Sequence, residues 1–163
     1  MEDSCRNLLG RVWFVHFSHK MKDLGQKINL PEVSATFACG EQIGREATAG
    51  QVIALVGDLG VGKTTLTQGI MKGLGYTGEV TSPTFSLVQE YRGERLDVFH
   101  FDFYRVEHEH ELIELGWDDY IERGGLIIVE WPALFPHLFP PETQWLQLEH
   151  VEQGRTLQSI SPL

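Results

Sequence analysis

The amino-acid sequence predicts an α/β fold, in which helices flank a mixed β-sheet that has antiparallel strands in its second half. Two observations lead to this prediction. From residue 33 onward, short apolar runs alternate with segments of helical period, which is typical of strands and helices that build a sheet covered on both faces. In the second half, apolar runs follow one another across short polar turns, which favours antiparallel pairing.

In the first half, hydrophobic periodicity predicts two strands and two helices in alternation. Apolar and polar side chains alternate in the first strand, whereas the second strand is a short apolar run that ends at Gly57. In the second helix, Leu66, Ile70 and Leu74 fall on one face, and Gly75 marks its end. The four elements, in the order strand, helix, strand, helix, are predicted at residues 33–39, 41–48, 51–56 and 63–74.

The second half is predicted to hold two hairpins, one acidic helix and one buried strand. Short polar segments at residues 92–95 and 152–154 separate strand-like runs and predict the two hairpin turns. The run at residues 126–129 is apolar throughout, which is typical of a strand covered on both faces. The strands are predicted at residues 85–91, 96–103, 126–129, 145–150 and 156–160, and the helix at residues 107–121.

The strongest motif is GxxxxGK(S/T), which lies between the second predicted strand and the second predicted helix. Its glycines let the backbone curl so that successive N–H groups point inward, and the helix N-terminus adds a partial positive charge. Lys63 can then reach the β and γ oxygens of ATP, and the Thr64 hydroxyl can ligate Mg²⁺. A P-loop NTPase-like fold that binds Mg-ATP is therefore predicted. The motif residues are Gly57, Asp58, Leu59, Gly60, Val61, Gly62, Lys63 and Thr64.

A P-loop also needs a carboxylate near the metal. Two predicted apolar strands are each followed directly by a carboxylate residue. Residues 126–129 lead to Glu130, and residues 98–101 lead to Asp102. Glu130 follows the cleaner apolar run, so we expect it to hold Mg²⁺ directly or through water, with Asp102 positioning the metal shell or the attacking water. The competing interpretation of Asp102 is a salt bridge to Arg105.

Two weaker signals lie near the same predicted site. Thr84, within residues 82–85, occupies the place of a switch segment whose hydroxyl senses the γ-phosphate and metal. A proline turn before a strand is the other interpretation of this segment. Trp131 directly follows Glu130, so its indole either lies beside the nucleotide or caps the core.

Composition and charge indicate one soluble domain. The chain has 163 residues, 42% of them apolar and 22% charged, which is the usual size of a single domain. No apolar run approaches the ~20 residues that span a bilayer, so no membrane association is expected. The net charge of −10 argues against a surface that grips a phosphate backbone through clustered Lys and Arg.

Cysteine and histidine usage predicts neither disulfides nor a zinc site. Only Cys5 and Cys39 occur, one in a tail and one at the end of a predicted strand, so a reducing cytoplasm fits best. His100 lies on a predicted strand, whereas His108 and His110 lie in a Glu-rich helix, and no cysteine stands at ligand spacing.

The first 30 residues differ from the rest of the chain. Basic residues outnumber acidic ones there, whereas the remainder is strongly acidic. We expect residues 1–30 to be a poorly ordered extension, with Met21 as an alternative start, and residues 31–163 to form the P-loop ATPase domain. A docking or regulatory arm is the other interpretation. The segment lacks a signal-peptide pattern.

Four ordered motifs of this chain resemble those of the TsaE (YjeE) family. A P-loop alone would be unspecific, but the order and spacing of all four are highly specific, and the resemblance covers roughly residues 33–160. The motifs are DLGVGKTT at residues 58–65, TSPTFSLV at 81–88, HFDFYR at 100–105 and IVEWP at 128–132. The family often has a second glutamate after the Trp-Pro pair where this chain has Ala133, and the long N-terminal extension is not typical.

The resemblance implies a cytoplasmic P-loop ATPase that acts with TsaB and TsaD. Their product is N6-threonylcarbamoyladenosine (t6A) at position 37 of tRNAs that read ANN codons, and tRNA is reached only through the complex. Motif by motif, the metal-binding threonine falls on Thr64, the lysine on Lys63, the catalytic aspartate on Asp102, and the strand-end glutamate and tryptophan on Glu130 and Trp131.

The residues expected to bind the nucleotide are thus the P-loop with Thr65, together with Thr84 and Trp131. Catalysis is assigned to Lys63, Asp102 and Glu130, with hydrolysis weak alone and stimulated by partners. Two other functions fit a P-loop: a small-molecule kinase, for which this chain offers no lid of clustered arginines, and a nucleotide switch that never hydrolyses.

Overall fold

Seven strands form one sheet within residues 24–163, which are the residues that the computed structural model describes. The strand order is β1-β7-β6-β2-β5-β4-β3. Strands β6, β2, β5 and β4 are mutually parallel, whereas β3, β7 and β1 each pair antiparallel with their neighbours. The predicted mixed sheet is confirmed. The strands are β1 (Ile28–Leu30), β2 (Val52–Val56), β3 (Val88–Tyr91), β4 (Val98–Asp102), β5 (Leu126–Glu130), β6 (Gln144–His150) and β7 (Arg155–Ile160).

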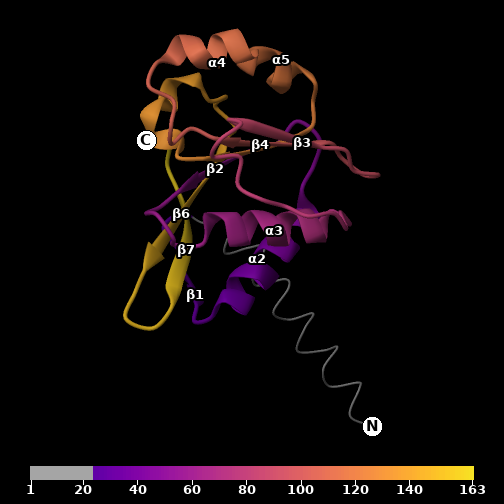
Figure 1. The fold of residues 1–163 in the computed structure, drawn as a ribbon. Helices are drawn as coiled ribbons and strands as arrows, with labels where there is room; N and C mark the ends of the chain where they lie inside the picture. Colours follow the sequence, from indigo (N-terminus) through magenta and orange to yellow (C-terminus); the bar gives the residue numbers. More distant parts are fainter. Residues whose placement is uncertain (1–23) are drawn as a thin grey trace.

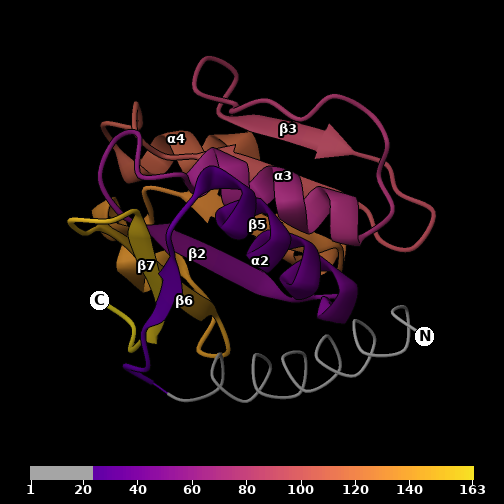
Figure 2. The same cartoon turned by 90° about the horizontal axis from the view of Figure 1, so that it is seen from below.

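Helices cover both faces of this sheet, as predicted (Figure 1). Helices α2 and α3 lie on one face, and α4 and α5 lie on the other (Figures 1 and 2). Alternate residues of β2 serve the two cores: Ile53 and Leu55 pack toward α2 and α3, and Val52 packs toward α4 and α5. None of the described helices is long and apolar enough to cross a membrane. The helices are α2 (Val33–Glu46), α3 (Lys63–Gly73), α4 (Glu109–Leu115) and α5 (Trp117–Glu122).

The prediction of a strand at residues 33–39 is wrong, because these residues begin helix α2. Their apolar and polar side chains alternate, but Thr36, Cys39 and Ile43 are the buried ones, at the three- and four-residue spacing of a helix. Cys39 is therefore buried within a helix instead of ending a strand. Burial raises the pKa of its thiol to about 12, which makes it a poor nucleophile.

Glycines on both helices decide how α2 packs on α3. A Cβ atom at Gly44 would lie 2.0 Å from the carbonyl oxygen of Ile70, and one at Gly40 would lie 2.2 Å from that of Leu66. On the other helix, a Cβ atom at Gly69 would lie 2.2 Å from the carbonyl oxygen of Phe37. The two backbones thus touch directly, and α2 fixes the helix that follows the P-loop.

Several predicted elements are shorter than expected. The acidic helix breaks at Gly116, whose left-handed φ of 86° ends α4 and caps α5. Residues 85–87 form a turn before β3, in which Leu87 has a φ of 63°. The first hairpin is present as the antiparallel pair β3–β4, and the second as β6–β7.

Strand β1 was not expected, because it lies within the stretch assigned to the N-terminal extension. It pairs antiparallel with β7, and its Ile28 and Leu30 side chains are buried in the core between the sheet and α2. The sheet therefore begins before residue 31. Residues 1–23, including Cys5 and Met21, lie outside the described residues.

We expect Leu30→Ala to lower the free energy of unfolding by ~2–3 kcal/mol, because it removes a buried side chain from a strand that can only partly collapse around the gap. Asn29→Ala, on the exposed face of the same strand, is the matched control and should change it by less than ~0.5 kcal/mol. Urea denaturation of both variants measures the difference. Equal stability of the two variants would show that β1 does not belong to the core.

Candidate functional site

The GxxxxGK(S/T) segment forms the predicted loop between β2 and α3. Gly57, Gly60 and Gly62 have φ values of 152°, 75° and 112°, in the left-handed region that favours glycine. Gly62 caps the N-terminus of α3, and the side chain of Val61 is fully buried in the core. The loop thus offers its backbone N–H groups and a helix N-terminus, which together suit an anion such as a phosphate.

Lys63 is folded back onto its own loop. Its Nζ donates to the carbonyl oxygens of Gly57 at 2.8 Å and Asp58 at 2.9 Å, and it lies 4.1 Å from the ring centroid of Trp131. Burial lowers the pKa of Lys63, and the nearby negative charge of Glu130 opposes that shift. The ammonium group is therefore held at the mouth of the loop by weak acceptors that phosphate oxygens can replace.

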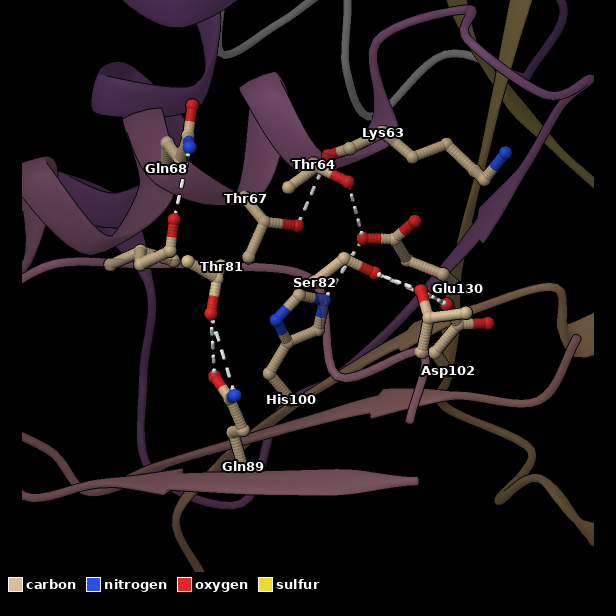
Figure 3. Close-up of polar contacts among 12 residues, drawn as sticks. Lys63, Thr64, Thr67, Gln68, Thr81, Ser82, Gln89, His100, Asp102 and Glu130 are labelled. Atoms are coloured by element: carbon tan, nitrogen blue, oxygen red, sulfur yellow. Dashed lines mark hydrogen bonds and ion pairs between the residues drawn. The ribbon is translucent and has the colours of Figure 1, made fainter. Parts of the chain in front are cut away.

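Glu130 lies beside the P-loop threonine. The Thr64 hydroxyl donates to Glu130 Oε1 at 3.1 Å, and His100 Nε2 lies 3.0 Å from the same oxygen (Figure 3). The residue is 4% exposed. Glu130 reaches this position because it is the last residue of β5. Since β5 is parallel to β2 and β4, the C-terminal end of β5 lies beside the start of the P-loop.

Asp102 holds the segment predicted to be a switch. Its Oδ2 accepts hydrogen bonds from the hydroxyls of Ser82 at 3.1 Å and Thr84 at 2.8 Å, and its Oδ1 accepts one from the Tyr104 N–H at 2.9 Å. The competing salt bridge to Arg105 is not formed, since the Arg105 guanidinium lies over the exposed Phe85 ring, 4.5 Å from its centroid.

These groups converge on one cavity of about 350 Å³. It is lined by most of the predicted site residues and by two that were not predicted, Ser82 and Tyr104. The lining residues are Leu59, Gly60, Gly62, Lys63, Thr64, Thr65, Ser82, Thr84, Asp102, Tyr104, Glu130 and Trp131. Gly57 and Asp58 line a neighbouring cavity of about 580 Å³, which shares Trp131 with the first.

The oxygen atoms at this cavity fit Mg²⁺. Thr64, Glu130 and Asp102 supply one hydroxyl and two carboxylates on its wall. No group of three His, Cys, Asp or Glu side chains that could hold a metal occurs within residues 24–163. A site with few protein ligands suits Mg²⁺, which usually keeps several waters and binds substrate phosphates.

Trp131 adopts a left-handed conformation at the edge of the cavity. Its φ of 60° places the indole against Tyr104, with 5.0 Å between ring centroids, and under the Lys63 ammonium. The indole is only partly buried and packs against the core formed with α4 and α5. One indole thus lines the cavity and packs on the edge of the core, and its contact with a nucleotide stays a prediction.

The prediction that His100 lies on a strand is confirmed, but sequence patterns did not predict its contact with Glu130. Its ring is completely buried on β4 and contacts the carboxylate of Glu130, far along the chain. Residues i and i+2 of a strand share a face, so Asp102 was a signal that His100 points the same way. The parallel pairing of β4 with β5, which brings Glu130 alongside, is a tertiary feature that no local pattern contains.

Comparison with known proteins identifies the family. A family model described as "Threonylcarbamoyl adenosine biosynthesis protein TsaE" matches residues 30–158. This chain belongs to the TsaE family. The predicted resemblance is therefore confirmed, and it extends over most of the chain.

Individual TsaE proteins are similar to this chain over most of their length. A protein from Synechocystis sp. PCC 6803 is 40% identical over 72% of this chain and 77% of its own, and one from Bacillus subtilis strain 168 is 42% identical over 75% of each. Both are named tRNA threonylcarbamoyladenosine biosynthesis protein TsaE. The crystal structure of Bacillus subtilis YdiB superposes with a TM-score of 0.68 at 31% identity, covering 84% of each chain.

Proposed function

We propose that this chain is a Mg²⁺-dependent ATPase that serves t6A formation on tRNA together with TsaB and TsaD. The observation that carries the ATPase part is the convergence of the P-loop, Lys63, the Thr64–Glu130 pair and the Asp102–Thr84 pair on one cavity. The t6A part rests on membership of the TsaE family.

The P-loop residues bind and orient the triphosphate. Backbone N–H groups around Gly60 and Gly62 surround the β-phosphate, and Lys63 exchanges its two loop carbonyl acceptors for β and γ oxygens. The exchange is favourable because a phosphate oxygen carries more negative charge than a carbonyl oxygen. The hydroxyl of Thr64 and the carboxylate of Glu130 would hold a bound Mg²⁺, whose positive charge would offset the negative charge of the phosphates.

Asp102 supplies the hydrolytic part of the site. The residue is 3% exposed and its carboxylate is held by three hydrogen bonds, so it can orient a water molecule next to the γ-phosphate. The Thr84 hydroxyl donates to Oδ2 of Asp102. When a γ-phosphate attracts this hydroxyl, Oδ2 loses that hydrogen bond and can accept one from water instead. The segment at residues 82–85 thereby senses which nucleotide is bound.

Partners are needed because the isolated site is incomplete. The cavity wall described above contains Lys63 as its one cation among residues 24–163, and Arg105 is stacked on Phe85. A P-loop site without an arginine finger stabilises the transition-state charge poorly, with a shortfall of ~10³ or more in rate. We propose that contact with TsaB and TsaD makes up this deficit, and that the tRNA is reached through these proteins.

Two other functions are distinguishable by direct measurement. A small-molecule kinase would transfer the γ-phosphate to an acceptor, and a nucleotide switch would bind ATP without turnover. ATP hydrolysis with and without the partner proteins, combined with a screen for phosphorylated acceptors, separates the three. Partner-stimulated release of inorganic phosphate without a phosphorylated acceptor supports the ATPase, and either other result rejects it.

The two carboxylates should have different roles. We expect Glu130→Ala to weaken Mg²⁺-dependent ATP binding by ~10-fold or more, because Thr64 loses its partner at the proposed metal position. Asp102→Ala should leave ATP binding within ~3-fold and lower turnover by ~10²-fold or more, as expected when a water-orienting group is lost. Titration calorimetry with and without Mg²⁺, and steady-state hydrolysis, give both quantities. Reversed effects would mean that the two roles are exchanged.

A further inference from the structure

A buried histidine contacts the proposed metal site without a role in the chemistry above. His100 is 0% exposed, and its Nε2 lies 3.0 Å from Glu130 Oε1. Its Nδ1 is buried and has no hydrogen-bond partner among residues 24–163. In Figure 3 the imidazole lies on the opposite side of the Glu130 carboxylate from Thr64. A polar ring buried in this way needs a reason beyond packing.

The contact defines which ring nitrogen carries the proton. A carboxylate can only accept hydrogen bonds, so His100 Nε2 donates to Glu130. The Nδ1 atom has no partner among residues 24–163 that could accept a hydrogen bond from it. The structure therefore favours the tautomer with hydrogen on Nε2.

The hydrogen bonds to Glu130 all fall on one of its two oxygens. Within the described residues, Oε1 accepts from both Thr64 and His100, whereas no hydrogen bond is formed by Oε2. Glu130 lines the cavity, and Oε2 is its carboxylate oxygen that is not engaged by Thr64 or His100. A hydroxyl that donates to Oε1 still has lone pairs to offer a cation, and so Thr64 and Oε2 can act on the same ion.

We propose that His100 is a positioning residue that fixes Glu130 with Oε2 directed to the cation site. This inference rests on the proposed Mg-ATP function and deepens it. Thr64 alone is a poor anchor, because its hydroxyl rotates freely and must also serve the metal. The rigid imidazole, fixed in the core of the sheet, holds the carboxylate before the nucleotide arrives. Partners of this kind commonly change metal affinity ~10–100-fold.

The test compares His100→Leu, which removes the donor, with His100→Gln, whose amide nitrogen can replace Nε2–H. His110→Leu, at an exposed histidine of α4, is the control. We expect His100→Leu to raise the Mg²⁺ concentration for half-maximal ATP binding by ~10-fold or more, with unchanged ATP binding in EDTA. His100→Gln should stay within ~3-fold of the unmodified chain, and His110→Leu should not differ from it.

A second measurement needs no nucleotide and no activity. In ¹⁵N-histidine-labelled protein, the His100 signal, assigned by its loss in His100→Gln, should show a protonated Nε2 and a bare Nδ1. Replacement of Glu130 by alanine should shift this signal. A ring with hydrogen on Nδ1 and none on Nε2 would overturn the inference, because Nε2 could then not donate to Glu130.

The remaining outcomes separate this inference from the proposed function. If the unmodified chain requires Mg²⁺ for ATP binding and His100→Leu requires no more of it, His100 does not position the site. Equal impairment of His100→Leu and His100→Gln shows a role in packing only and also rejects the inference. If Mg²⁺ does not change ATP binding by the unmodified chain, the proposed metal site itself is wrong, and this inference is rejected with it.

Discussion

Lys63→Ala is expected to weaken Mg-ATP binding by ~10²–10⁴-fold and to abolish measurable turnover. The variant loses an ammonium group that would donate to the β- and γ-phosphates, and each charge-assisted hydrogen bond contributes ~1.5–3 kcal/mol. Lys63 is buried at the cavity, and its present acceptors are loop carbonyls that the phosphates can replace. Part of the loss falls on turnover, since Lys63 would also stabilise the charge that develops on the phosphate oxygens in the transition state.

The matched control for this variant is Lys72→Ala. Lys72 is an exposed lysine in the last turn of the same helix and lies outside the cavity. The Lys72→Ala variant should bind ATP with the affinity of the unmodified chain. Titration calorimetry gives both affinities, and thermal unfolding shows that both variants are folded. ATP affinity and hydrolysis unchanged in Lys63→Ala would remove the P-loop assignment altogether.

Gly44→Ala should lower the free energy of unfolding by ~3 kcal/mol, at the upper end of the usual range for overpacking in a core. Replacing a glycine by alanine inside an exposed helix would instead raise the free energy of unfolding by ~1 kcal/mol, because alanine has the better helix propensity. The sign is decided by the new methyl group, which would lie 2.0 Å from the carbonyl oxygen of Ile70. A backbone atom cannot rotate away, so the two helices must separate.

Ala38→Leu, on the exposed side of the same helix, is the control for side-chain bulk. It should alter stability by less than ~0.5 kcal/mol. Urea denaturation of both variants measures the difference. A stabilised Gly44→Ala would contradict the close backbone contact between α2 and α3, and with it the view that α2 fixes the helix of the P-loop.

The loop between β2 and α3 at the candidate site could be predicted from sequence because its geometry is local. The run from β2 through the loop to α3 is continuous in the chain, and its glycines and Lys63 stand at fixed spacing. Glu130 and Asp102 could also be named, since strands β5 and β4 both end in a carboxylate and parallel strands align their carboxyl ends. The TsaE resemblance added the order of the four motifs, and the family match bears it out.

The features that were missed depend on tertiary contacts. Residues 33–39 fit a strand by alternation and a helix by the spacing of Thr36 and Cys39, and only the contact of α2 with the glycines of α3 decides between them. Strand β1 has three residues, too few to show a period, and is held by pairing with β7, which is far away in the sequence. His100 acquires its partner only when β5 joins β4.

Multiple-turnover threonylcarbamoylation of tRNA, reconstituted with cognate TsaB and TsaD, measures whether this chain serves t6A formation. The same reaction is run without this chain, with it, and with its Lys63→Ala variant. We expect repeated product formation only with the unmodified chain, together with ATP hydrolysis stimulated by the partners. Equal product in all three reactions would contradict the proposed role in t6A formation.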